Sequence, residues 1–330
     1  MQIIESAGWL EGSIWLLSST GTIRPSGTLS SLDLKTRTKT ERHIPTIGTV
    51  EQVLVLPENK ILIATSNGEL WQYTCRKMEL LSTLPASSLP ELRDRYGLDN
   101  RSTLHDIQES GIAKGKGSPL FRDRILNMFR HDHEILMLTS ASLLRYDLAS
   151  GTWNTIPLQH LIPKAIRMPA IFPGDGYIYQ GTCIGEWGGD LKRINITTGA
   201  VDILFEGTQV TSLVKNPWDP GTALFGTGSW HMGLNRGGIY HTSEKCEPLL
   251  SGKAVYSMTS NEDNIIAATR DGVYRIHEEG ACERYDYPDH EWYNGVGLVS
   301  DPRFGTFMLT EIYRAVMLCG LVPLFPEKEP

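Results

Sequence analysis

The sequence predicts an all-β protein built from repeated four-stranded units, and two observations carry this prediction. Short apolar runs recur at intervals of 47, 74, 43, 45, 42 and 41 residues, and each ends in a hydroxyl residue: Ser18, Thr65, Thr139, Thr182, Thr227, Thr269 and Thr310. The runs lie among short alternating segments separated by regular turn signals, which is typical of all-β folds. A period in the low forties indicates a repeat architecture, most often a β-propeller with four strands in each blade. Seven runs therefore predict seven blades, and six blades with a degenerate terminal unit are the alternative.

Each unit is expected to contain the same four strands in the same order. The first apolar strand, such as residues 2–6, ends in a turn rich in Asp, Asn, Gly or Pro, as at 57–60. Such residues tolerate tight hairpin geometry. The second strand is the apolar run itself, and a turn ending in Gly leads to an alternating third strand, as at 271–276. A further hairpin, as at 146–151, leads to the fourth strand.

The repeated threonines are interpreted as structural residues rather than as a ring of ligands. Thr at the end of a strand agrees with its β propensity, and its hydroxyl can bond to nearby backbone groups. This interpretation predicts hydrogen bonds between these hydroxyls and nearby backbone groups.

The units resemble the blades of WD-repeat, YVTN-type and lactonase-type propellers over nearly the whole chain. The resemblance implies membership of the β-propeller superfamily without pointing to one family within it. The signature pairs of true WD repeats are absent, because Trp218-Asp219 falls in a turn between a first and a second strand.

The chain is expected to form one propeller domain over residues 1–330, interrupted by an insertion at 85–122. The insertion does not follow the strand pattern. Ser88 is expected to cap a short helix over 91–96 that ends at Gly97, and 111–119 is expected to be a flexible basic loop. Long connections of this kind usually carry function or are disordered.

Charge and composition limit the classes of function. The formal net charge of −7 disfavours general nucleic-acid binding, which needs a basic field. The longest apolar stretch, 315–322, is much shorter than the roughly 18 residues of a membrane-spanning helix. The beginning of the chain lacks the pattern of a secretion signal, and the five cysteines show no CxxC spacing. We therefore expect a cytoplasmic protein with no membrane and no nucleic-acid partner.

Two short motifs suggest a metal or a phosphate, and neither supports a cofactor. Residues 131–134 read His-Asp-His-Glu, but they lie in a hairpin between a first and a second strand. Neighbouring side chains in a tight turn diverge, so we expect a solvated turn there and not a metal site. The glycines and lysines of 111–118 lack the spacing and the flanking strand and helix of a phosphate-binding loop. No cofactor is expected.

The best candidate site lies on the face of the propeller where second strands end and third strands begin, which we call the top face. Its loops carry Trp, Arg and His beside glycines, and Trp and Arg are the residue types most enriched at binding hot spots. The predicted binding residues are Trp187, Trp230, His231, Arg236, Trp292, Tyr293, Arg124 and Arg167. Packing of the tryptophans between blades is the structural alternative.

These residues favour a protein-interaction module that binds a protein partner, such as an enzyme that it inhibits or scaffolds. The first alternative is a metal-dependent hydrolase or lyase, which the resemblance to lactonase-type propellers implies. Its acidic, amide and base candidates are Glu51, Glu186, Asn294, Glu311 and His231. The second alternative is a binder of carbohydrates or other small ligands, because Trp rings stack on sugars.

Overall fold

The computed structural model consists of antiparallel sheets joined in chain order. It describes residues 2–10, 13–20, 27–33, 38–43, 50–56, 60–74, 77–85, 87–88, 112–114, 120–163, 165, 167–229, 235–243, 247–261, 263–278, 280–287, 293–301, 305–312 and 319–323. Side chains are described for most of these residues from residue 50 onward. The described chain contains no α-helix, and its one helical turn is the 3₁₀ segment η1 (Gly185–Trp187). No described helix is long and apolar enough to span a bilayer.

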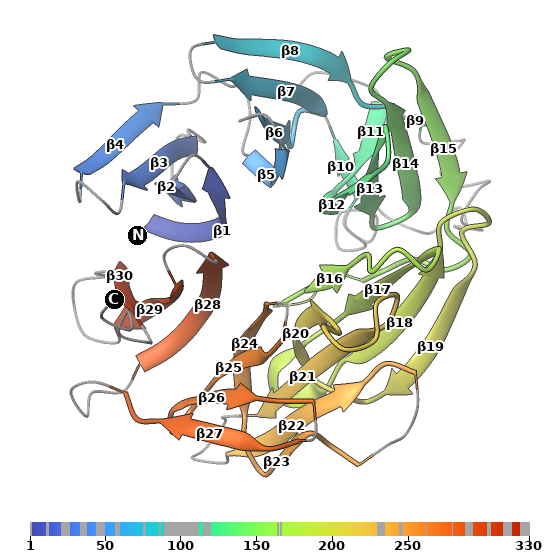
Figure 1. The fold of residues 1–330 in the computed structure, drawn as a ribbon. Helices are drawn as coiled ribbons and strands as arrows, with labels where there is room; N and C mark the ends of the chain where they lie inside the picture. The colour runs from blue at the N-terminus through green and yellow to red at the C-terminus, as the bar shows by residue number, and fades with distance from the viewer. Residues whose placement is uncertain are drawn as a thin grey trace. The chain divides into compact units, whose positions relative to one another are not determined.

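The chain divides into two compact units, one formed by Met1–Lys164 with Thr197–Ala200 and one by Ala165–Ile196 with Val201–Pro330. The first unit contains three four-stranded sheets, whose strands lie side by side in chain order (Figure 1). They are β1 (Gln2–Leu10), β2 (Ser13–Thr20), β3 (Gly27–Asp33) and β4 (Thr38–His43); β5 (Val50–Leu56), β6 (Lys60–Thr65), β7 (Glu69–Thr74) and β8 (Lys77–Thr83); and β12 (Ile125–His131), β13 (Glu134–Thr139), β14 (Ser142–Asp147) and β15 (Trp153–Pro157).

The second unit contains three more four-stranded sheets and one three-stranded sheet. The four-stranded sheets are β16 (Ala170–Ile171), β17 (Tyr177–Gly181), β18 (Asp190–Asn195) and β19 (Val201–Glu206); β20 (Val210–Lys215), β21 (Ala223–Ser229), β22 (Arg236–His241) and β23 (Leu250–Ser251); and β24 (Val255–Ser260), β25 (Ile265–Thr269), β26 (Val273–Ile276) and β27 (Cys282–Tyr285). The three-stranded sheet consists of β28 (Tyr293–Asp301), β29 (Gly305–Ile312) and β30 (Cys319–Pro323).

The predicted insertion contains strand structure at its two ends. A small sheet pairs β11 (Leu120–Asp123) with β10 (Ile112–Lys114) and with β9 (Ser87–Ser88). Ser88, which was expected to cap a helix, pairs with Leu120 in this sheet. The helix expected at 91–96, with Gly97, lies outside the described residues. Part of the loop expected at 111–119 is strand β10.

A β-bulge explains why a hydroxyl residue recurs in the sequence. In six sheets the register of the first strand shifts by one residue, and the shift directly follows the residue that pairs with the hydroxyl residue of the second strand. Val50 pairs with Thr65, for example, whereas Gln52 pairs with Ala64, so Glu51 is the extra residue. The repeat in the sequence therefore marks a repeated bulge as well as a repeated strand end.

The structure confirms backbone hydrogen bonds for threonines whose side chains it describes. Thr139, which is fully buried, accepts from the backbone N–H of Ser142 at 2.8 Å. Thr182 accepts from Asp190 N at 2.8 Å, and Thr227 accepts from Gly238 N at 3.1 Å. Each hydroxyl therefore closes the turn between the second and the third strand of its sheet.

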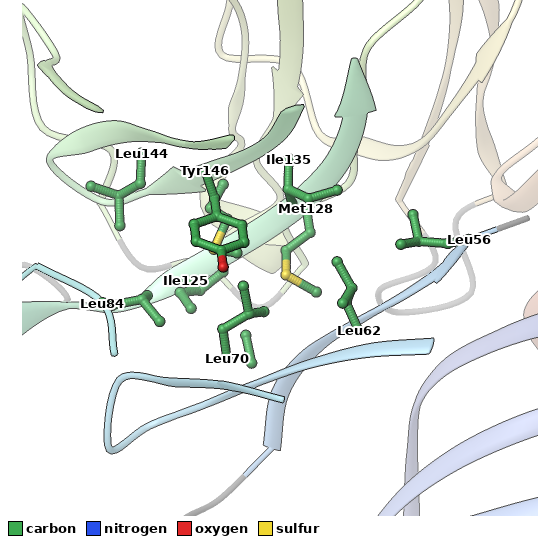
Figure 2. Packing of buried hydrophobic residues seen from close by; sticks show 11 residues of the cluster. Leu56, Leu62, Leu70, Leu84, Ile125, Met128, Ile135, Leu144 and Tyr146 are labelled. Atoms are coloured by element: carbon green, nitrogen blue, oxygen red, sulfur yellow. The ribbon is translucent and has the colours of Figure 1, made fainter. Parts of the chain in front are cut away.

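Apolar side chains pack between neighbouring sheets in both units. In the first unit, Leu62 and Leu70 of one sheet face Met128 and Ile135 of the next (Figure 2). Trp153 packs against this cluster and donates its indole N–H to Ser82 at 2.8 Å. In the second unit, an equivalent cluster joins the sheets that begin at β20 and β24. Burial of such side chains is the main stabilising contribution to folding.

Candidate binding surface

The most exposed large apolar side chain among the described residues is Trp187, at 80% of its maximum. It lies in η1, within the loop that joins β17 to β18. Ile184, in the same loop, is 37% exposed. The sequence singled out this tryptophan, and its exposure agrees with a role in binding and disagrees with packing between sheets. Its role in binding stays a prediction.

The loop that carries Trp187 is fixed at both ends. Cys183 exchanges two backbone hydrogen bonds with Arg167, at 3.0 and 3.3 Å, and the Ile184 N–H donates to Gly188 O at 2.8 Å. The side-chain amide of Gln209 donates to Gly185 O. These contacts hold the backbone on both sides of Trp187, although the indole itself projects into solvent.

Glycines make this loop geometry attainable. Gly185 and Gly188 have φ angles of 69° and 89°, in the left-handed region that favours glycine. At Gly189 the limit is space, because a Cβ atom there would lie 2.0 Å from the carbonyl oxygen of Thr182. The sequence pattern of glycines around Trp187 therefore reflects a specific, crowded turn.

Arg167 serves to join two sheets of the second unit. Its guanidinium Nη1 donates to the backbone carbonyl of Tyr256 in β24 at 2.9 Å, while its backbone pairs with Cys183. The side chain is half-buried. Arg167 was predicted as a binding residue. This contact shows that it also has a structural role, because it links the base of the Trp187 loop to the first strand of the neighbouring sheet.

The other predicted site residues have different surroundings. Arg236 is exposed at the start of β22, and its side chain has no partner among the described residues. Arg124 is exposed directly before β12, in the first unit. Tyr293 begins β28 and its backbone pairs with Ile312, but its side chain is not described. Trp230, His231 and Trp292 lie outside the described residues.

An ion pair beside the turn between β25 and β26 was missed by the sequence analysis. Lys253 bonds to Asp271, which also accepts from the hydroxyl of Thr269 at 2.9 Å. Burial alone raises the pKa of Asp271, but the hydrogen bonds from Lys253 and Thr269 outweigh this effect and lower it. The bond to Asp271 in turn raises the pKa of Lys253. The sequence offered one signal for this pair, because Asp271 lies two residues after the repeated threonine Thr269.

The residues of the hydrolase alternative are only partly described. The carboxylate of Glu51 accepts a hydrogen bond from the Ile125 backbone N–H at 3.0 Å. Asn294 and Glu311 are direct backbone partners in β28 and β29, and their side chains are not described. The side chain of Glu186 is also not described, and His231 lies outside the described residues. The described contacts do not bring these groups together.

Comparison with solved structures shows the fold class. The chain resembles YCF48 bound to D1 peptide, with a TM-score of 0.59 and 11% identity over 94% of this chain and 89% of that one. It resembles the β-propeller domain of the Trilobed protease from Pyrococcus furiosus, with a TM-score of 0.52 and 10% identity over 100% and 99% of the two chains.

A third structure of the same kind is PorZ, a surface component of the type-IX secretion system of Porphyromonas gingivalis. The TM-score is 0.57 and the identity 11%, over 92% of this chain and 44% of that one, so this chain spans less than half of PorZ. No family model and no curated sequence matches the chain. The likeness establishes a β-propeller fold, as the sequence predicted.

Proposed function

We propose that this chain is a protein-interaction module, a single seven-bladed propeller over 1–330 that binds a protein partner through its top-face loops. The observation that carries the proposal is the exposure of Trp187 on a loop held at both ends. Tryptophan is the residue type most enriched at binding hot spots, where truncation commonly costs about 2 kcal/mol or more.

The fixed loop adds to this argument. A loop that is already ordered loses little conformational freedom when a partner binds, so more of the contact energy appears as affinity. The contacts of Cys183, Ile184 and Gln209 therefore suit Trp187 to act as a preorganised anchor. Arg236, exposed and without a partner among the described residues, is a second contact that we assign to the same surface.

The comparisons support the proposal in general terms. YCF48, which shares the fold, has been solved with a bound peptide. At 11% identity the likeness carries the fold and not the ligand, so the partner must be identified for this chain itself. The cytoplasm, which the sequence predicts as the location, is part of the proposal.

The test is affinity capture from lysate of the native host with wild-type protein and the Trp187→Ala variant, with identification of retained proteins by mass spectrometry. Ile203→Ala is a matched control, because Ile203 is also an exposed apolar side chain, at 58%, but lies on the outer strand β19. We expect one partner to be retained by wild type and by the control, and to be lost or strongly reduced with Trp187→Ala.

The proposal for this surface fails if every retained partner binds the Trp187→Ala variant as well as the wild type. Melting curves of all three proteins show whether each variant is folded. Lactone and ester hydrolysis assays on the same samples test the enzyme alternative, and quenching of Trp fluorescence by sugars tests the small-ligand alternative.

A further inference from the structure

A cluster of metal-ligating side chains lies at the opposite end of a sheet from the top-face loops, where β13 begins and β14 ends. His133, Glu134 and Asp147 each offer one ligand atom, and these atoms all lie within 4.8 Å of one another. The His133 Nε2 atom is 3.3 Å from Asp147 Oδ2. Two of the three residues belong to the His-Asp-His-Glu motif of the sequence.

Sheet pairing brings the third residue to the turn. Glu134 and Asp147 are direct partners in the antiparallel pair of β13 and β14, so their side chains lie on the same face of the sheet. The Leu148 N–H donates to His133 O at 3.0 Å and holds the turn against the end of β14. The argument that adjacent turn residues diverge therefore does not apply to this set, which combines a turn with the neighbouring strand.

The two carboxylates are oriented by groups that bond to one oxygen of each. Arg145 donates from both Nε and Nη2 to Oε2 of Glu134, and Oε1 has no partner among the described residues. Asp147 accepts from the backbone N–H groups of Ala149 and Ser150 through Oδ1, so that Oδ2 faces His133. Partners of this kind orient the ligands of metal sites.

Electrostatics favour a cation at this point. Like charges directly opposite each other on two strands are destabilising, and Glu134 with Asp147 is such a pair. Arg145 bonds to Glu134 and supplies one positive charge beside these two carboxylates. A second cation between the carboxylates would remove the remaining repulsion.

We propose that His133, Glu134 and Asp147 bind a zinc ion that ties the β12–β13 turn to the end of β14. One imidazole and two carboxylate oxygens are ligand types that Zn²⁺ accepts, and three protein ligands leave a position for water. Ca²⁺ and Mg²⁺ prefer all-oxygen sites, so the imidazole selects against them. The site is independent of the proposed protein-binding surface, from which it differs in both residues and loops.

The test is calorimetric titration of the metal-stripped full chain with zinc chloride. We expect one bound equivalent in the wild type, with affinity reduced at least about tenfold in His133→Ala and in Asp147→Asn. Asn keeps the Oδ1 acceptor for Ala149 and Ser150, so this variant preserves the turn while it replaces Oδ2. Zinc should also raise the melting temperature of the wild type and not that of His133→Ala.

His277→Ala is the matched control. His277 Nε2 also lies beside a carboxylate, at 3.4 Å from Glu283 Oε1, but no third ligand joins the pair among the described residues. The control should bind zinc like the wild type. The proposal is wrong if wild type binds no zinc, if both His133→Ala and Asp147→Asn bind it unchanged, if His277→Ala abolishes binding, or if calcium binds at the same site as tightly.

Discussion

The carboxylate of Glu51 accepts a hydrogen bond from the backbone N–H of Ile125, so that one sheet is bonded to the first strand of the next described four-stranded sheet. Glu51 is the extra residue of the bulge in β5, and its neighbour Gln52 donates to Leu126 O at 2.6 Å. The second unit repeats the arrangement, since the bulge residue Thr211 donates to Val255 O at 2.6 Å. The bulge thus directs side chains from one first strand to the backbone of another.

Replacement of Glu51 by Ala should lower the free energy of unfolding by about 1.5–3 kcal/mol, because it removes a charge-assisted acceptor from a partly buried N–H. Glu51→Gln keeps an acceptor oxygen and should recover much of the loss. Urea unfolding of the full chain measures both. Glu79→Ala is the control, because Glu79 forms an exposed pair with Lys77, which contributes little. Equal stability of Glu51→Ala and wild type would show that the contact does not join the sheets.

Thr139→Val should destabilise the chain by about 1–3 kcal/mol without a change in volume. The hydroxyl of Thr139 accepts from the N–H groups of Ala141 and Ser142, at 3.2 and 2.8 Å, and the residue is fully buried. Valine leaves both donors without this acceptor. Thr139→Ser keeps the hydroxyl and should lose less. Chemical unfolding compares the two variants, and a Thr139→Val protein as stable as Thr139→Ser would contradict the structural role of the repeated threonines.

Much of the fold could be predicted because each repeat has a recognisable local pattern of apolar runs and turn residues. The recurrence from Ser18 to Thr310 gave the period, and the structure has a second strand that ends at or next to most of these residues. The cap predicted at Ser88 shows the limit of such reasoning. A capping residue followed by helix-forming residues is a local signal, whereas Ser88 forms a strand because β11 pairs with it.

The candidate site was predictable only in part. The sequence placed Trp187 on a loop flanked by glycines but left binding and packing between blades as alternatives, and the structure shows that the residue is exposed. The bond from Arg167 to Tyr256 and the approach of Asp147 to His133 join residues 89 and 14 positions apart. Such contacts depend on strand register and on packing between sheets, and neither is visible in one sequence without the fold.

Gly189→Ala should disturb the Trp187 loop more than its small size suggests. The added Cβ would lie 2.0 Å from Thr182 O and 2.9 Å from Thr208 O, and both are backbone atoms that cannot move aside easily. We expect a loss of stability and a change in the fluorescence spectrum of Trp187. The Trp187 contribution is obtained by subtracting the spectrum of the Trp187→Phe variant. Gly207→Ala is the control, since a Cβ there meets nothing within 4 Å and only the φ of 70° is strained. Similar spectra for the two variants would contradict the crowding argument.

Tyr179 should make stability depend on alkaline pH. Burial, followed by the hydrogen bond from its hydroxyl to Asp175 at 2.8 Å, raises the pKa of Tyr179 from 10.0 to about 12. A raised pKa means that the folded chain holds the phenol proton more tightly than the unfolded chain does. The contribution to stability is therefore fully present below pH 10 and is lost as the pH rises from about 10 to 12.

Unfolding experiments at a series of pH values in wild type and Tyr179→Phe measure this contribution. Phenylalanine cannot ionise, so the variant should lose less stability between pH 10 and 12 than the wild type, although it lacks the bond to Asp175 at neutral pH. Other tyrosines with raised pKa values, including Tyr146 and Tyr274, leave a residual pH dependence in the variant. Parallel curves for the two proteins over this range would show that the Tyr179 phenol titrates alike in the folded and unfolded chains, and would remove Asp175 as the group that holds its proton.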